Sequence, residues 1–188
     1  RFMSEKKKTI IGIDYSLTSP AVCILFDQTP CFYYLTGKKK YEGVMSANIV
    51  GDMHKEYNTP IQRFTQISDW AMDIINEQIN PYVFIEGYSF GSKGQAIFQI
   101  AENCGILKYR LEQNNIPYET IVPSVVKKFA TGKGNADKEK MYDKYYEDSG
   151  VNLMEVLDQQ TLANPVTDIV DSYYIARCGY ENSISNKS

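Results

Sequence analysis

The stretch Lys8-Thr-Ile-Ile-Gly-Ile-Asp14 is an apolar, β-favouring run that ends in an acid. We interpret it as a buried central strand, because strands covered on both faces are continuously apolar and do not alternate. Two further strands are predicted at 21–26 and 31–36, around the turn Asp27-Gln-Thr-Pro30, as a hairpin continuous with the first strand. The beginning of the chain therefore predicts three adjoining strands, with a carboxylate where the first strand leaves the sheet.

Beyond these strands, residues 43–50 suggest another strand, and from about residue 57 the apolar residues recur at three- and four-residue steps. That period predicts an amphipathic helix to about Gln78. The elements expected after it are a strand at 82–86, a loop at 87–94, a helix at about 95–113, a strand at 116–122, a short helix at 123–131, a glycine-rich loop at 131–135, a helix at about 137–146, an irregular excursion at 149–163 and a last helix to about 179. Asn164 and Pro165 are expected to be the N-cap and first residue of that last helix.

This order of elements predicts an α/β fold, a mixed sheet with helices on both faces. The chain has 188 residues, no visible repeat and no linker, so we expect a single domain over residues 3–180. Arg1 and Phe2 precede Met3 and are interpreted as a remnant of cloning. Residues 181–188 are predicted to be a frayed polar tail.

Composition excludes several classes of protein. Hydrophobic residues make up 43% and charged residues 23%, as in globular proteins, and the formal net charge of −3 argues against nucleic-acid binding over the whole surface. This net charge does not exclude a basic patch on one part of the surface. Cys23, Cys31, Cys104 and Cys178 lack zinc or disulfide-framework spacing, although Cys23 and Cys31 flank a turn and could face each other. Without an apolar run of membrane-spanning length or a signal peptide, the expected location is the cytoplasm, with no membrane partner.

Four carboxylates stand where an acid is unfavourable without a partner. Asp14 and Glu86 each end an apolar strand, and parallel neighbouring strands would bring both to the carboxyl edge of the sheet, where such sheets place their sites. Asp168 and Asp171 share one face of the largely apolar last helix and repel each other unless a cation holds them. Each acid alone also fits a plain role at a helix end or in an ion pair. Four together predict hard oxygen ligands for Mg²⁺ or Mn²⁺.

The segment 125–138 is basic and contains two glycines. Lys127, Lys128, Lys133 and Lys138 accompany a single acid there, Asp137. Because glycine lets a main chain approach a ligand closely, the pattern predicts contacts with phosphates. A mobile, solvated loop has the same composition, and the spacing is not that of a Walker A loop.

The loop after Glu86 combines aromatic and small polar residues. Tyr88 and Phe90 lie beside Lys93, two serines and two glycines. This arrangement suits stacking on an unpaired base next to a metal site. Packing of Phe90 under the following helix is the equally open alternative.

Four motifs follow one another over about residues 8–178. They are Ile11-Gly-Ile-Asp14-Tyr-Ser, Phe84-Ile-Glu86, Thr131-Gly-Lys-Gly-Asn-Ala-Asp-Lys138 and Asp168-Ile-Val-Asp171-Ser-Tyr-Tyr-Ile-Ala. Their order resembles that of the RuvC-type Holliday-junction resolvases. The resemblance implies an RNase H-like fold with a mixed five-stranded sheet, and a homodimer that cuts four-way DNA junctions in recombination and repair.

The same resemblance implies roles for single residues. Those expected are metal-binding catalytic acids at Asp14, Glu86, Asp168 and Asp171, junction phosphate contacts at Lys127, Lys133 and Lys138, an aromatic wedge at Phe90 and a dimer interface on the helix at about 95–113. Two Mg²⁺ or Mn²⁺ ions per site would activate a water and stabilise the leaving 3′ oxygen, producing a 5′ phosphate. A basic side chain such as Lys138 could stabilise the charge of the transition state.

The chain departs from the family pattern in three places. The segment between Asp14 and Glu86 and the excursion at 149–163 look longer than in bacterial enzymes, and the loop after Glu86 reads Gly-Tyr-Ser-Phe in place of a Gln-Val-Phe type. These departures suggest a divergent phage or other viral member, which would act in the host cytoplasm.

Three alternative functions stay open. The first is a related nuclease of the same fold that acts on flap, branched or hybrid substrates. The second is an actin-like or sugar-kinase-like ATPase, whose first phosphate loop resembles the sequence around Asp14 but which needs a duplicated domain. The third is a non-catalytic junction-binding protein, which the four intact acids disfavour.

Overall fold

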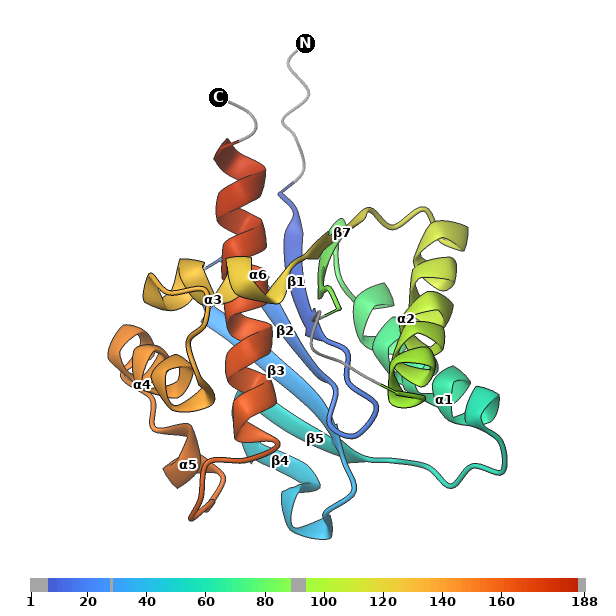
Figure 1. Cartoon of the computed structure of the whole chain (residues 1–188), viewed down its shortest axis with the longest axis horizontal. Coiled ribbons are helices and arrows are strands. Elements are labelled where there is room, and N and C mark those ends of the chain that lie inside the picture. Colours follow the sequence, from blue (N-terminus) through green and yellow to red (C-terminus); the bar gives the residue numbers. More distant parts are fainter. Residues whose placement is uncertain (1–6, 28, 89–93, 186–188) are drawn as a thin grey trace.

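One mixed β-sheet runs through the computed structural model, which describes residues 7–27, 29–88 and 94–185 (Figure 1). The strands are β1 (Thr9–Asp14), β2 (Ala21–Phe26), β3 (Thr29–Thr36), β4 (Gly43–Ser46), β5 (Ile49–Met53), β6 (Pro81–Glu86) and β7 (Tyr118–Ile121). Their order in the sheet is β4-β5-β3-β2-β1-β6-β7. The predicted mixed α/β architecture and the central place of β1 are confirmed, but the sheet has seven strands and the expected number of five is wrong.

β4 and β5 are the two strands beyond the five that the family resemblance implies. They replace the single strand expected at 43–50, because the chain turns at residues 47–48 and returns antiparallel to itself. Asn48 stabilises this turn: its Oδ1 accepts from the Ser46 hydroxyl at 2.9 Å, and its Nδ2 donates to the Pro30 carbonyl at 2.8 Å. β5 then pairs parallel to β3 and extends the sheet.

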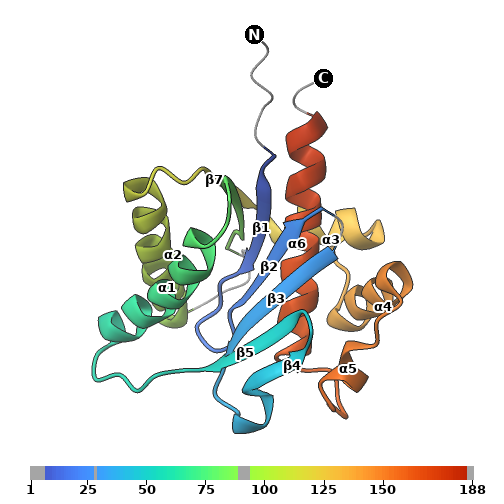
Figure 2. The ribbon, with the colours of Figure 1, turned by 180° about the vertical axis from the view of Figure 1, so that it is seen from behind.

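The helices form two layers, one on each face of the sheet. They are α1 (Pro60–Asn76), α2 (Ala96–Gln113), α3 (Pro123–Thr131), α4 (Lys138–Ser149), α5 (Leu153–Val156), α6 (Val166–Ser185) and the short 3₁₀ helix η1 (Lys39–Tyr41). Side chains alternate along β1, so Ile11 packs under α1 and α2 whereas Ile10 packs toward α6. Figures 1 and 2 show α6 crossing one face of the sheet, with α3, α4 and α5 beside it.

Two glycines bring α6 close to the sheet. A Cβ on Gly12 of β1 would lie 2.4 Å from the main-chain nitrogen of Ala176 and from the carbonyl oxygen of Ser172. A Cβ on Gly179 of α6 would lie 2.3 Å from the ring of Phe84 on β6. Since real Cβ atoms do not approach so closely, these positions need glycine, and the contact holds the beginning of α6 near the end of β1.

The ends of several elements differ from the sequence-based expectation. α6 begins at Val166, so Pro165 precedes the helix, and the Asn164 side chain accepts a hydrogen bond from the Thr167 hydroxyl at 3.0 Å. The helix also continues to Ser185, past the expected end near residue 179. The excursion at 149–163 contains the short helix α5, which Asn152 caps by accepting from the Glu155 N–H.

The structure shows that Cys23 and Cys31 do not form a pair. Cys23 and Cys31 lie on opposite faces of the sheet, so they cannot face each other, and all four cysteines are free. The alternation of side chains along β2 and β3 causes this separation. Within the described ranges, no helix is long and apolar enough to cross a membrane.

Candidate active site

Asp14 and Glu86 meet at the carboxyl edge of the sheet. β1 and β6 are parallel neighbours, and Ile13 lies opposite Ile85. The next residues on the two strands are Asp14 and Glu86, which therefore leave the sheet side by side. The predicted juxtaposition of these two acids is borne out by the strand register.

Asp168 and Asp171 lie in the first two turns of α6, which cross the same edge. The Asp168 side chain is hydrogen-bonded to Asp14, and its Oδ2 accepts from the Ser19 hydroxyl at 2.8 Å. Only 7% of Asp168 is exposed. The helix therefore adds its two acids to those of the strands, with Asp168 held behind Asp14.

Burial raises the pKa of all four carboxyl groups, and the charges of neighbouring acids raise those of Asp14, Glu86 and Asp171 further. Burial raises the pKa of Asp14 well above its usual value, and the charges of Asp168, Asp171 and Glu86 raise it further. Burial, followed by the charges of Glu86 and Asp168, raises the pKa of Asp171 to about 8. Burial also raises the pKa values of Glu86 and Asp168. Without a cation, the site therefore holds protons at neutral pH.

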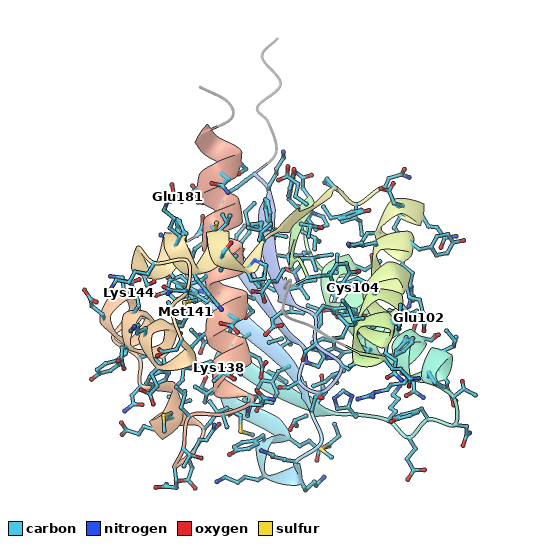
Figure 3. The ribbon with its side chains drawn as sticks, viewed as in Figure 1. Glu102, Cys104, Lys138, Met141, Lys144 and Glu181 are labelled. Atoms are coloured by element: carbon cyan, nitrogen blue, oxygen red, sulfur yellow. The ribbon has the colours of Figure 1, made fainter. Side chains whose placement is uncertain are left out.

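Two of the predicted lysines face the same acids. The positive charges of Lys127 and Lys138 oppose the rise in the pKa of Asp171. Both line a cavity of about 720 Å³ together with Asp14, Glu86 and Asp171. Figure 3 shows Lys138 and Met141 beside the lower half of α6, and Cys104 on α2. The cavity is therefore lined by both acidic and basic side chains.

Two more of the predicted DNA contacts, Lys128 and Lys133, do not line this cavity. Lys128 and Lys133 are exposed, Lys128 in the last turn of α3 and Lys133 in the loop that follows Gly132. That loop is tied to α3, because the Thr131 hydroxyl contacts the main chain of Lys133. Phe90 and Lys93 lie outside the described residues, so their predicted roles stay predictions.

The structure adds residues whose roles the sequence did not assign. Ser19 contacts Asp168 across 149 residues of chain, which no local pattern can indicate. Tyr15 and Cys104 line the cavity, and Tyr15 has a buried hydroxyl without a hydrogen-bond partner. The loop that contains Ser19 follows the strand that ends in Asp14, but this position alone does not identify Asp168 as its partner.

The donor set fits a hard divalent cation. Asp14, Glu86, Asp168 and Asp171 supply carboxylate oxygens, the ligands that hard divalent cations prefer, and burial disfavours their ionised forms in the absence of a cation. Among the described residues, no three such side chains are already arranged around one point as metal ligands. A cation would therefore require the carboxylates to give up their protons and turn toward it.

Solved structures share this architecture. The structure of RuvC from Thermus thermophilus matches with a TM-score of 0.61 and 13% identity, over 95% of this chain and 96% of that one. The structure of Thermus thermophilus RuvC in complex with a Holliday junction substrate matches with a TM-score of 0.68, also at 13% identity and with the same coverage. The chain has the RuvC fold. This confirms the expected RNase H-like class.

A sequence match points to the same proteins. The crossover junction endodeoxyribonuclease RuvC of Brachyspira hyodysenteriae (strain ATCC 49526 / WA1) is 29% identical over 115 residues, which are 61% of this chain and 70% of that protein. No protein-family model matches the chain. The resemblance to RuvC that the ordered motifs predict is therefore confirmed in both sequence and fold.

Proposed function

We propose that this chain is a divalent-metal-dependent endonuclease that resolves four-way DNA junctions by paired phosphodiester hydrolysis. The observation that carries the proposal is the cavity in which Asp14, Glu86 and Asp171 meet Lys127 and Lys138, in a chain with the RuvC fold. The similarity to a crossover junction endodeoxyribonuclease supports the same activity. An enzyme with this substrate would work in the cytoplasm, the host's if the chain is viral.

The acids would hold the metal. Asp14, Glu86 and Asp171 face the cavity, and Asp168 would complete the ligand set from behind Asp14. When bound, two Mg²⁺ or Mn²⁺ ions would activate a water for in-line attack and stabilise the leaving 3′ oxygen. The carboxyl groups must first release the protons that burial and the neighbouring charges retain, so the activity should rise with pH.

The lysines would act on the phosphate itself. The charges of Lys127 and Lys138 both act to lower the pKa of Asp171, and both side chains line the cavity, so they would also lie near a phosphate held at those acids. Fixed positive charges there would stabilise the negative charge that develops on the phosphoryl oxygens during attack. Lys128 and Lys133 are exposed beyond the cavity and would contact neighbouring phosphates of the substrate.

Paired cuts require two active sites, and α2 offers a surface for a homodimer. Phe98 is 67% exposed and Tyr109 is 63% exposed. They lie eleven residues apart, three helical turns, and therefore on the same side of α2 as Gly105, where no atom would approach an added Cβ within 4 Å. Large exposed aromatic side chains on one helix face are typical of a covered interface. We therefore propose that α2 packs against α2 of a second copy.

A labelled synthetic four-way junction tests the proposal. With Mg²⁺ the protein should introduce two symmetric nicks with ligatable 5′ phosphates, and with chelator it should not cut. Asp14→Asn should abolish cleavage, whereas Asp73→Asn, which changes an exposed acid on α1, should leave it unchanged. Equal cutting of flaps or RNA–DNA hybrids would indicate the broader nuclease, and binding without cutting would indicate a structural junction binder.

A further inference from the structure

The loop at residues 15–20 connects the acid that ends β1 with the beginning of β2. The ladder between these strands ends with Asp14 opposite Ala21, so the loop lies beyond it. Ser16, Leu17 and Thr18 line the active-site cavity. Because the loop begins directly after Asp14 and contains Ser19, which holds Asp168, its conformation affects two of the four acids.

Two side chains from a distant segment hold this loop. Nε2 of His54 lies 2.7 Å from the carbonyl oxygen of Thr18, and Nη2 of Arg63 donates to the carbonyl oxygen of Leu17 at 3.0 Å. A carbonyl can only accept, so Nε2 of His54 carries a proton in this contact. Two consecutive carbonyls of the loop are therefore fixed by donors 36 and 46 residues further along the chain.

The two donors are themselves well anchored. His54 lies in the connection between β5 and α1, which passes below the carboxyl edge of the sheet in Figure 1, and Arg63 lies in the first turn of α1 that follows it. The main-chain N–H of His54 donates to the Thr36 carbonyl at the end of β3 at 3.0 Å. The Arg63 guanidinium lies over the ring of Tyr57 at 5.2 Å. The connection and the first turn of α1 can therefore act as a rigid support for the loop.

We infer that His54 and Arg63 are positioning residues, which keep the loop at 15–20 in the conformation that sets Asp14 and Asp168 for metal. The inference rests on the proposed function. Neither side chain lines the active-site cavity; both line a separate cavity of about 370 Å³ beside Trp70. They act only by fixing the loop carbonyls. This indirect effect can still be large, because a displacement of about 1 Å at the reacting groups is enough to slow catalysis greatly.

Alanine and conservative variants test this role, with Gln66→Ala as the matched control. Gln66 also extends from α1 to a loop carbonyl, that of Glu56, at 2.8 Å, but Glu56 does not line the active-site cavity. His54→Gln and Arg63→Lys retain a donor that can reach the same carbonyls. The measurements are amide hydrogen exchange of residues 15–20 without metal, Mg²⁺ affinity by calorimetry, junction affinity in chelator and single-turnover cleavage.

His54→Ala and Arg63→Ala should each speed up exchange in the loop, weaken Mg²⁺ binding severalfold and slow cleavage by roughly tenfold to a hundredfold. Junction affinity in chelator should stay within about twofold, because both side chains lie outside the cavity. His54→Gln and Arg63→Lys should recover most of the loss, and Gln66→Ala should match the wild type.

Unchanged exchange in the loop would overturn the inference, and so would a His54→Gln variant that is folded but no better than His54→Ala. If the alanine variants do not fold while the conservative variants do, His54→Phe, which keeps a ring without the donor, decides between packing and positioning: a wild-type rate in His54→Phe overturns the inference. If the wild type does not cleave any junction, the proposed function fails, and the exchange and Mg²⁺ measurements still decide this inference.

Discussion

The first two turns of α6 place Asp168 and Asp171 among four carboxylates, whereas the next two pack Ala176 and Gly179 against the sheet. The turns with Ala176 and Gly179 contact the sheet so closely that one of the two residues in each contact must be glycine. In the first two turns, burial raises the pKa of both carboxyl groups, and the charges of Glu86 and Asp168 raise that of Asp171 further. One helix therefore combines a stabilising contact with a destabilising cluster of charge.

This difference shows how the fold can tolerate the site. Protein interiors favour close packing and disfavour unpaired charge. The packing between Gly12 and Ala176 fixes α6 to β1 about a turn beyond Asp171. This packing, and not the acids themselves, stabilises the position of the helix. Substitutions in the two halves should therefore have opposite effects on stability and activity.

The largest effect is expected from Asp171→Asn. The substitution removes a ligand from the proposed metal site, so junction cleavage in Mg²⁺ should fall at least about a thousandfold, as for other essential catalytic groups. It also removes a carboxyl group whose pKa is raised to about 8. The metal-free variant should therefore be more stable than the wild type above pH 8, by several degrees in Tm.

Exposed Asp143 on α4 provides the control, because Asp143→Asn changes the same charge outside the cavity. It should leave both cleavage and Tm close to those of the wild type. If Asp171→Asn lowered Tm and retained cleavage, the lower half of α6 would be part of the structural core and the comparison between the two halves would fail.

Gly12→Ala should have the next largest effect, in the other half of the contact. The added Cβ meets main-chain atoms of α6, which cannot rotate away, so overpacking should reduce stability by about 1–3 kcal/mol. Chemical denaturation measures this loss. Gly37→Ala is the control, because nothing lies within 4 Å of its Cβ, and it should be nearly neutral. Equal stability of the two variants would contradict the close contact of α6 with β1.

Much of this arrangement is predictable from the sequence, because it depends on local patterns. The apolar run that ends in Asp14 identifies the central strand, and the similar run ending in Glu86 identifies its parallel neighbour. The three-to-four residue period identifies α1, and α2 lies where the sequence predicts a helix at about 95–113. Apolar strands each ended by an acid therefore suffice to predict both the fold class and the meeting of the two acids.

What could not be predicted depends on long-range contacts. Residues 43–50 contain no glycine or proline at 47–48, where the chain turns, so they resemble one strand; the turn depends on Asn48 reaching the Pro30 carbonyl. Similarly, nothing near Ser19 or His54 in the sequence indicates a partner at Asp168 or Thr18. The strand count and the supports of the acids therefore required the three-dimensional structure.

A smaller effect is expected from pH. A carboxyl group whose folded pKa lies above its unfolded value binds a proton more tightly in the folded state, so stability is greatest below the unfolded pKa and falls as pH rises. For Asp171 the window runs from about 4 to about 8. The Tm of the metal-free protein should therefore decrease across this range, and Asp171→Asn should flatten the decrease. Saturating Mg²⁺ should also oppose it, since ligands that bind only the folded state stabilise it. A Tm that rises steadily from pH 5 to 8 would contradict the charge cluster.

The smallest effect is expected from Ser19→Ala. Burial raises the pKa of Asp168, and the hydrogen bond from Ser19 opposes that rise. Loss of this bond is worth about 1 kcal/mol, which corresponds to roughly a fivefold slower cleavage. Because Asp168 would then retain its proton to higher pH, the rising limb of the pH–rate profile should move to higher pH. Ser172→Ala is the matched control: its buried hydroxyl donates to the Ile169 carbonyl on the same helix at 2.8 Å and contacts no acid. It should lower stability without moving the pH profile, and an identical shift in both variants would mean that Ser19 does not act through Asp168.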